Sequence, residues 1–246
     1  MMDLQHLTSL TITAGPDVRF TGVLHDSGND NPLIALFPAD CRPSDSYYPL
    51  IKQLAAENIN TAFLAYPGCE SDSDAPSNNA ARTIDLTHPG KTPAPFFVMG
   101  QSIGSLHALH FIQQAADNVT GIILESPVID LDSFLSDAGT THTAYTLPPS
   151  VAIDPHAVLK KLDVPLLIIY GQRDEYVGAL ETEALHLAGI AKNKQYYIVP
   201  GATHFSIAER AGSLYVAGLT RFINQITGRN TWRDKRRKFK AAGTAS

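Results

Sequence analysis

The chain has 246 residues, of which 44% are hydrophobic and 17% are charged, a balance typical of folded globular proteins and not of disordered ones. No apolar run approaches the roughly 20 residues that a membrane-spanning helix needs. The first residues lack the basic and apolar segments of a secretion signal, so we expect a cytoplasmic protein.

The net charge of −5 is unevenly distributed along the chain. Residues 229–240 contain seven Lys or Arg and one Asp, a net +6 that leaves −11 on the remainder. An acidic body argues against nucleic-acid binding. We expect residues 1–228 to form a single domain and residues 229–246 to form a basic, flexible tail, with membrane-surface contact through this tail as the minor alternative. The sequence does not fix the oligomeric state.

The two cysteines, Cys41 and Cys69, are too few for a disulfide framework and do not have metal-ligand spacing. We therefore expect reduced thiols that take no part in catalysis. His107 and His110 lie three residues apart on a predicted helix and are the other candidate metal ligands. Because no third ligand has suitable spacing, we interpret both histidines as packing residues and expect neither a metal nor a cofactor.

The N-terminal part of the chain predicts the beginning of an α/β sheet. Residues 8–13 and 18–24 alternate loosely between apolar and polar and flank a turn, which predicts an antiparallel hairpin. Residues 33–37 and 61–66 are largely apolar, as in strands buried on both faces, and a helix is predicted between them at residues 48–57. Strand, helix and strand in this order imply parallel pairing with a right-handed crossover.

The rest of the chain continues this alternation. A short helix is predicted at residues 80–86, and residues 128–156, which have no strand pattern, are interpreted as a small lid insertion. The other predicted strands are residues 96–99, 119–124, 164–170 and 195–199. One further helix is predicted to begin at Ile103, and three more are predicted at residues 155–162, 178–188 and 209–226. This pattern predicts an α/β fold with a mostly parallel central sheet and helices on both faces.

The most informative stretch lies between the strand at residues 96–99 and the helix after it. Its sequence is Gly100-Gln-Ser-Ile-Gly104. The two glycines allow a tight reversal and expose Ser102 at its apex as a candidate nucleophile. We expect Ile103 to be the first residue of the helix, so its backbone N–H has no partner inside the helix and is a candidate oxyanion-hole donor.

A serine nucleophile needs a histidine base and an acid that orients the histidine. Asp174 follows the penultimate predicted strand, and His204 follows the last one. Both lie at carboxyl ends of parallel strands, the sheet edge at which Ser102 also lies. Glu175 and Glu125 are alternative acids, Glu125 because it ends the strand after the nucleophile helix.

Four segments together resemble the α/β-hydrolase superfamily, and within it the small-lid bacterial serine hydrolases and esterases with their depalmitoylase-like and serine-aminopeptidase-like relatives. They are Gly-Gln-Ser-Ile-Gly-Ser at residues 100–105, Ile-Ile-Leu-Glu-Ser-Pro at 122–127, Tyr-Gly-Gln-Arg-Asp at 170–174 and Pro-Gly-Ala-Thr-His at 200–204. The order Ser102, Asp174, His204 is also the order of that superfamily. The resemblance covers roughly residues 7–226 and implies an α/β-hydrolase fold with a Ser-His-Asp triad and no cofactor.

One position departs from the pattern of these relatives. Many of them carry His-Gly after the first buried parallel strand, and the next residue donates the second oxyanion-hole N–H. The corresponding stretch here is Phe37-Pro38-Ala39-Asp40, and Pro38 has no N–H. Ala39 is therefore the expected donor, with Asp40 as the alternative.

These features predict a serine hydrolase that cleaves the carboxylic ester of a small acyl substrate through an acyl-enzyme. A thioesterase or a peptidase/amidase on the same triad is an alternative, and so is a hydrolase-fold binding protein without catalytic activity. Aromatic residues near the strand ends are candidates for a pocket, but each is also consistent with the core: Tyr47, Tyr48, Tyr145, Tyr176 and Phe205.

Overall fold

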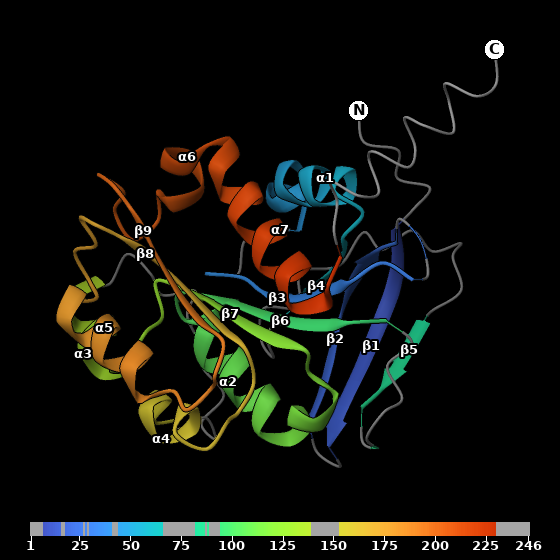
Figure 1. The fold of residues 1–246 in the computed structure, drawn as a ribbon, viewed down its shortest axis with the longest axis horizontal. Helices are drawn as coiled ribbons and strands as arrows, with labels where there is room; N and C mark the ends of the chain where they lie inside the picture. Colours follow the sequence, from blue (N-terminus) through green and yellow to red (C-terminus); the bar gives the residue numbers. More distant parts are fainter. Residues whose placement is uncertain are drawn as a thin grey trace.

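The computed structural model describes residues 7–15, 18–26, 28, 30–40, 44–65, 82–86, 88, 94–138 and 153–229. Within these described residues, nine strands form one sheet in the order β5-β1-β2-β4-β3-β6-β7-β8-β9 (Figure 1). The strands are β1 (Leu7–Gly15), β2 (Val18–His25), β3 (Leu33–Phe37), β4 (Asn60–Leu64), β5 (Arg82–Asp85), β6 (Phe96–Gln101), β7 (Gly121–Glu125), β8 (Leu166–Gly171) and β9 (Lys194–Val199). The β1/β2 and β2/β4 pairs are antiparallel, and the other six pairs are parallel.

Helices cover both faces of this sheet. They are η2 (Ser44–Tyr47), α1 (Tyr48–Ala56), α2 (Gly104–Ala115), η3 (Ala116–Asn118), α3 (Leu131–Ala138), α4 (Pro155–Leu159), α5 (Ala179–Ala188), α6 (Ile207–Ala211) and α7 (Ser213–Thr227). Figure 1 shows α1, α6 and α7 on one side of the sheet and α2, α4 and α5 on the other. The predicted α/β architecture, with a mostly parallel sheet and an antiparallel N-terminal hairpin, is confirmed.

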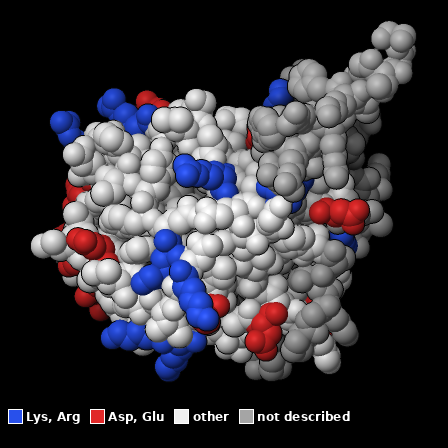
Figure 2. Space-filling model, in the orientation of Figure 1, with Lys and Arg blue, Asp and Glu red and all other residues white. Residues whose placement is uncertain are grey.

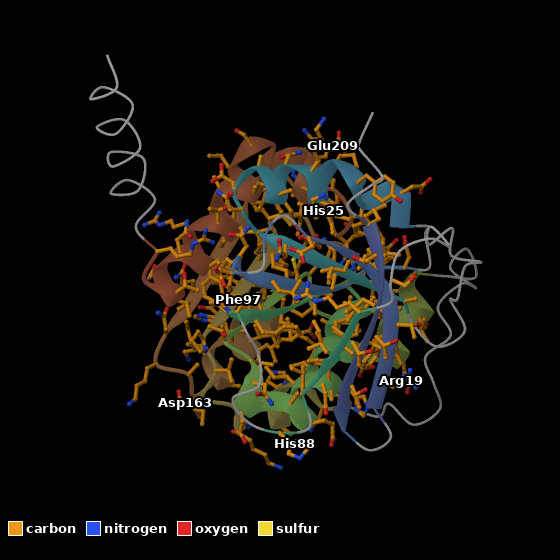
Figure 3. The ribbon with its side chains drawn as sticks, turned by 90° about the vertical axis from the view of Figure 1, so that its right-hand side faces the viewer. Arg19, His25, His88, Phe97, Asp163 and Glu209 are labelled. Carbon is orange, nitrogen blue, oxygen red and sulfur yellow. The ribbon has the colours of Figure 1, made fainter. Side chains whose placement is uncertain are left out.

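The central strands are apolar because both of their faces are buried. Every residue of β3, β4, β6, β7 and β8 is buried. In β6, Phe96 and Val98 belong to the core that includes α2, whereas Phe97 and Met99 belong to the core that includes α1 and α7. Figure 3 shows Phe97 inside the molecule and Asp163 and Glu209 at its periphery. The alternation along one strand thus builds two cores separated by the sheet.

The predicted short helix at residues 80–86 is wrong, because Arg82–Asp85 form the edge strand β5, which pairs in parallel with β1. Exposure alternates along β5, with Arg82 and Ile84 half-buried and Thr83 and Asp85 exposed. This period of two is that of a strand, and Thr83 and Ile84 are β-branched residues that favour one. An ion pair between Arg82 and Asp26 ties the first residue of the strand to the loop after β2.

The predicted closing helix at residues 209–226 is two helices, α6 and α7. They are separated by Gly212, whose φ of +55° is a conformation that L side chains rarely adopt. The break lets both helices border the same pocket, because α6 contributes Ala208 and Glu209 while α7 contributes Tyr215 and Val216.

The predicted lid is described only in part. Its first segment forms α3, and Asp154 caps α4 as expected by accepting the N–H groups of His156 and Ala157 at 2.9 and 3.2 Å. Residues 139–152 lie outside the described part of the chain, as do residues 230–246 of the basic tail. The division into one domain, lid and tail therefore stays a prediction.

The described residues contain no helix that is both long and apolar enough to cross a membrane. On the face shown in Figure 2, Lys and Arg side chains lie over the centre and lower part, and Asp and Glu side chains lie mainly toward the margins. Charges of both signs therefore share this face. The expected absence of nucleic-acid partners stays a prediction.

Candidate active site

Ser102 lies in the turn between β6 and α2 and has a left-handed backbone conformation, with φ +50°. Non-glycine residues rarely adopt this conformation. The Ser102 N–H donates a 2.9 Å hydrogen bond to the carbonyl of Glu125, which ties the turn to β7. A Cβ atom on Gly104 would lie 2.3 Å from the Phe37 carbonyl oxygen and 2.4 Å from that of Pro38. Glycine at this position therefore lets the start of α2 lie directly against the backbone at the end of β3.

Three side chains from separate loops form one hydrogen-bonded chain. The Ser102 Oγ lies 2.7 Å from His204 Nε2, and His204 Nδ1 lies 2.9 and 3.0 Å from the two carboxylate oxygens of Asp174. The side chains of His204 and Asp174 are fully buried. Because a carboxylate only accepts hydrogen bonds, Nδ1 carries the proton and Nε2 accepts the Ser102 hydroxyl. This is the protonation state in which the imidazole acts as a base toward the serine.

The pKa of Asp174 lies below its ordinary value. Burial alone raises the pKa, but the hydrogen bond and charge of His204, the Ser126 hydroxyl and the Val177 N–H together outweigh it. Ser126 Oγ donates to Oδ2 at 2.7 Å, and the N–H groups of Tyr176 and Val177 donate to Oδ1 at 3.1 and 3.0 Å. These donors keep the buried carboxyl ionised beside the imidazole.

Neither alternative acid lies against the imidazole nitrogen. The Glu175 carboxylate accepts the backbone N–H of His204 at 3.2 Å, so it fixes the loop and not the ring. The Glu125 carboxylate accepts the Gln101 side-chain amide at 3.2 Å and the Tyr215 hydroxyl. Of the three acids considered from the sequence, Asp174 is the one that the structure brings to His204 Nδ1.

Aromatic rings pack around His204 on several sides. Phe134 of α3, Tyr176 and Phe205 have ring centroids 5.3, 5.4 and 4.6 Å from that of the imidazole. Phe134 also belongs to a small apolar cluster with Ile103. Helix α3, which belongs to the predicted lid, thus packs against His204. Phe205 remains 41% exposed.

A pocket of about 580 Å³ opens beside Ser102 and His204. Its wall combines apolar residues with polar groups from η2, α1, α6, α7 and the ends of β6 and β7. The lining residues are Ala39, Ser46, Tyr47, Pro49, Leu50, Gln53, Gln101, Ser102, Glu125, His204, Phe205, Ala208, Glu209, Gly212, Ser213, Tyr215 and Val216. Two of the aromatic candidates from the sequence, Tyr47 and Phe205, are therefore pocket residues.

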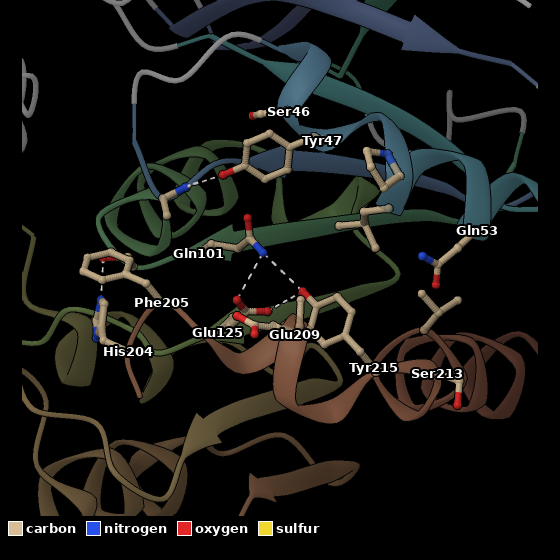
Figure 4. Close-up of a pocket in the computed structure, with 17 residues that line it drawn as sticks. Ser46, Tyr47, Gln53, Gln101, Glu125, His204, Phe205, Glu209, Ser213 and Tyr215 are labelled. Atoms are coloured by element: carbon tan, nitrogen blue, oxygen red, sulfur yellow. Dashed lines mark hydrogen bonds between the residues drawn. The ribbon is translucent and has the colours of Figure 1, made fainter. Parts of the chain in front are cut away.

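A buried polar cluster of Gln101, Glu125 and Tyr215 borders this pocket (Figure 4). The Gln101 amide donates to Glu125 and also to the Tyr215 hydroxyl, each at 3.2 Å, and Tyr215 donates to Glu125. Burial raises the pKa of Glu125 above its ordinary value, although the hydrogen bonds from Tyr215 and Gln101 act in the opposite direction. The cluster joins β6 to β7 and α7.

Of the two predicted oxyanion-hole residues, Ile103 directly follows Ser102 in the chain and Ala39 borders the same pocket as Ser102. Helix α2 begins at Gly104, one residue later than predicted, so Ile103 directly precedes it, where backbone N–H groups have no intrahelical partner. Ala39 lines the pocket after β3, and its N–H donates a 3.2 Å hydrogen bond to the Tyr47 hydroxyl. The role of both N–H groups stays a prediction.

His107 is buried, and its ring stacks on Phe37 with centroids 6.4 Å apart. Burial, followed by the nearby His110, lowers the pKa of His107 to about 4, so the ring is neutral near neutral pH. This environment agrees with the packing interpretation. Among the described residues, no group of three His, Cys, Asp or Glu side chains is arranged to hold a metal ion. Cys41, Cys69 and Tyr145 lie outside the described residues.

The sequence analysis did not single out Ser126 or Tyr215, and it gave Tyr47 only as a candidate pocket aromatic. Ser126 donates to Asp174, Tyr47 accepts the Ala39 N–H, and Tyr215 donates to Glu125. Ser126 carried a sequence signal, because it directly follows a buried strand, as Ser102 does.

A family model described as serine aminopeptidase, S33, matches residues 77–146 of the chain. This stretch contains Ser102 but neither Asp174 nor His204. The chain is also similar to an uncharacterized protein of Mycobacterium tuberculosis strain H37Rv, with 22% identity over 211 residues that cover 82% of this chain and 73% of that protein.

Several solved structures share the fold. An esterase of Pyrococcus furiosus aligns with a TM-score of 0.66 at 18% identity over 92% of both chains. Est1E of Butyrivibrio proteoclasticus aligns with a TM-score of 0.61 at 14% identity, over 90% of this chain and 100% of that one. A monoacylglycerol lipase of Paleococcus ferrophilus aligns with a TM-score of 0.57 at 14% identity, over 80% of this chain and 96% of that one. The sheet topology and these likenesses show that the chain has the α/β-hydrolase fold.

Proposed function

We propose that this protein is a serine hydrolase that cleaves carboxylic esters through an acyl-enzyme. The observation that carries the proposal is the continuous chain of hydrogen bonds from Ser102 through His204 to Asp174, at the edge of an open pocket. The names of the structural neighbours, which include esterases and a lipase, are consistent with this reaction.

In the first half of the reaction, Ser102 Oγ attacks the ester carbonyl carbon while its proton passes to His204 Nε2. The tetrahedral intermediate carries its negative charge on the former carbonyl oxygen, near the N–H groups of Ile103 and Ala39. The Asp174 carboxylate stabilises the imidazolium. The intermediate then collapses, the C–O bond to the alcohol breaks, and His204 donates its proton to the leaving oxygen, which leaves an ester on Ser102.

In the second half, a water molecule takes the place of the alcohol. His204 Nε2 accepts one water proton as the water oxygen attacks the acyl carbon, and the second tetrahedral intermediate releases the carboxylic acid. The proton held by His204 returns to Ser102 Oγ. The cycle needs no cofactor, because every proton that leaves one group is taken up by another in the same site.

An amidase or peptidase on the same triad is the second candidate, and the S33 family model favours it. The chemistry differs in one step, because the leaving amine is a poorer leaving group and depends more on proton donation by His204. A panel of p-nitrophenyl ester, thioester and p-nitroanilide with the same acyl group separates ester, thioester and amide hydrolysis. The ester proposal requires the highest kcat/KM on the oxygen ester after correction for the spontaneous rate.

The proposal is tested by burst kinetics with p-nitrophenyl acetate and butyrate. We expect the wild type to release one equivalent of p-nitrophenol per enzyme before the steady state, and Ser102→Ala to lose the burst and roughly 10⁵-fold in turnover. A fluorophosphonate probe should add to Ser102 in the wild type, as read by peptide mass spectrometry. Folding of the variant is checked by circular dichroism.

The matched control is Ser136→Ala, which removes a hydroxyl from an exposed residue of α3. We expect it to keep both the burst and the labelling. Equal rates in wild type and Ser102→Ala, together with no labelling of Ser102, would contradict the proposal and favour the non-catalytic binding protein.

A further inference from the structure

The Ala39 N–H, the oxyanion donor expected after β3, already has a partner inside the pocket. It donates to the hydroxyl of Tyr47 at 3.2 Å (Figure 4). The residue before it, Pro38, has no N–H, so this loop has no donor one position earlier. An oxyanion at this place therefore meets the N–H of Ala39 together with the tyrosine hydroxyl that accepts from it.

We infer that the Tyr47 hydroxyl donates a hydrogen bond to the oxyanion that forms when Ser102 attacks the substrate. This inference rests on the proposed serine-hydrolase function and goes beyond the two backbone donors expected for it. Tyr47, Ala39 and Ser102 border the same pocket. Figure 4 marks the hydrogen bond at the Tyr47 hydroxyl with a dashed line.

The hydrogen bond from Ala39 directs the tyrosine proton away from the backbone. A hydroxyl oxygen that accepts an N–H cannot point its own hydrogen along the same line, so the O–H is aimed elsewhere. Accepting a hydrogen bond also polarises the O–H and makes it a stronger donor. The pair therefore acts as an extended donor, in which the Ala39 dipole strengthens the bond from Tyr47 to the developing charge.

The position of the Tyr47 side chain is fixed by packing. Its ring lies against Phe63 of β4, with centroids 4.9 Å apart, and packs on the core that includes α1 and α7. Tyr47 is the last residue of η2, immediately before α1, whose second residue is Pro49. A donor held in place before the reaction stabilises the transition state without a reorganisation cost.

The charges around the pocket explain the use of an additional donor. Its described lining includes the carboxyl groups of Glu125 and Glu209, and none of the described lining residues is a Lys or Arg. A hydroxyl dipole aimed at a developing negative charge stabilises that charge without a cation.

The test is Tyr47→Phe, with Tyr48→Phe as the matched control. The phenylalanine keeps the ring against Phe63 and removes only the hydroxyl, whereas Tyr48 is the neighbouring tyrosine and does not line the pocket. We expect Tyr47→Phe to lower kcat for p-nitrophenyl butyrate about 10- to 100-fold with KM changed less than about threefold. The control should keep the wild-type kcat and KM.

A second readout uses a trifluoromethyl ketone that adds to Ser102 and carries an oxyanion. Its inhibition constant should rise in Tyr47→Phe by the same factor by which kcat/KM falls, because both reflect the same charge. A purely structural role would instead lower the melting temperature and change KM, with no parallel loss of inhibitor affinity. Circular dichroism and thermal melts of both variants give the comparison.

An unchanged or faster turnover of Tyr47→Phe would overturn the inference. If the tyrosine only blocks Ala39, its removal frees that N–H, and Tyr47→Phe turns over as fast as the wild type or faster. This result leaves the serine-hydrolase proposal standing, because the burst and the labelling of Ser102 persist. A wild type without burst or labelling overturns both proposals at once, so the two failures are distinguishable.

Discussion

Asp174 and Glu125 are carboxyl groups at the ends of the neighbouring strands β8 and β7, and their surroundings shift their pKa values in opposite directions. Asp174 accepts hydrogen bonds from two backbone N–H groups and from the side chains of Ser126 and His204. Together these donors hold its pKa below the ordinary value. Glu125 accepts from Gln101 and Tyr215, but burial dominates and raises its pKa.

The difference shows that position at a strand end does not decide which acid serves the histidine. Both residues lie at the sheet edge that holds Ser102, and from the sequence both were candidates. What separates them is the set of donors, because Asp174 accepts two backbone N–H groups from its own loop after β8 and the hydroxyl of Ser126, which directly follows β7. Two carboxyl groups whose pKa values are shifted apart are suited to different tasks, one to carry a charge and the other to remain neutral more readily.

The largest expected effect comes from Asp174→Asn. The N–H groups of Tyr176 and Val177 require an oxygen at the Oδ1 position, so the new amide nitrogen takes the Oδ2 position, 3.0 Å from His204 Nδ1. The amide nitrogen then donates to Nδ1, and the imidazole proton moves to Nε2. A protonated Nε2 cannot accept the serine proton. We expect kcat/KM for p-nitrophenyl butyrate to fall about 10⁴-fold.

The paired measurement is Glu125→Gln, which should lower kcat/KM less than about 10-fold, since Glu125 does not contact the imidazole nitrogen. Steady-state kinetics on the two purified variants give the comparison. Similar losses of kcat/KM in both variants would show that Asp174 and Glu125 contribute equally to catalysis.

A smaller effect is expected from Ser126→Ala, which removes the hydroxyl that donates to Asp174 Oδ2 at 2.7 Å. A hydrogen bond to a charged group contributes about 1.5–3 kcal/mol, so kcat/KM should fall roughly 10-fold as the carboxylate loses part of its support. The effect should nearly vanish in the Asp174→Asn background, because the two residues act as one unit. A loss of equal size in both backgrounds would place the role of Ser126 elsewhere.

Ser126→Ala also changes how stability depends on pH. The lowered pKa of Asp174 contributes stability that is present above the unfolded-state pKa and is lost as the pH falls through the folded-state pKa. Without the Ser126 hydroxyl the pKa of Asp174 rises toward its unfolded value, so this contribution shrinks. Urea unfolding should show the variant less stable by about 1 kcal/mol near neutral pH, with the difference fading in acid.

Much of this fold could be predicted because the information is local. Most central strands are largely apolar runs, and each loop with a candidate catalytic residue follows a predicted strand. The edge strand β5 was missed because four residues with one apolar side chain, Ile84, carry little local signal, and their pairing with β1 is tertiary. The break at Gly212 was missed because a glycine within a helical pattern does not reveal its φ of +55°.

The surroundings of the site could not be predicted, because they join distant segments. Tyr215 and Gln101 are 114 residues apart in the chain and meet only when α7 packs on the sheet. Tyr47 and Ala39 are eight residues apart, but their contact depends on how η2 turns back over the end of β3. Sequence patterns identify residues at strand ends, whereas the donors that set their charge come from packing.

The smallest expected effect is on stability and concerns Glu125. The pKa of Glu125 is raised in the folded state, so this carboxyl ionises in the unfolded chain at a lower pH than in the folded protein. The protein therefore loses stability as the pH rises from about 4.5, until the pKa of the folded state is passed. Glu125→Gln is neutral at every pH and escapes this loss. The Tyr215 hydroxyl can rotate to accept from the new amide, so the buried cluster keeps its hydrogen bonds.

We therefore expect the free energy of unfolding of Glu125→Gln, relative to the wild type, to increase as the pH rises from about 5 to about 8. Urea unfolding at both pH values measures it, and Glu209→Gln, which removes the same charge from an exposed residue of the pocket, is the matched control. A relative stability that falls over this range would mean that Tyr215 and Gln101 stabilise an ionised Glu125. In that case both acids at the sheet edge would be charged in the folded protein, and only their distance from His204 Nδ1 would distinguish them.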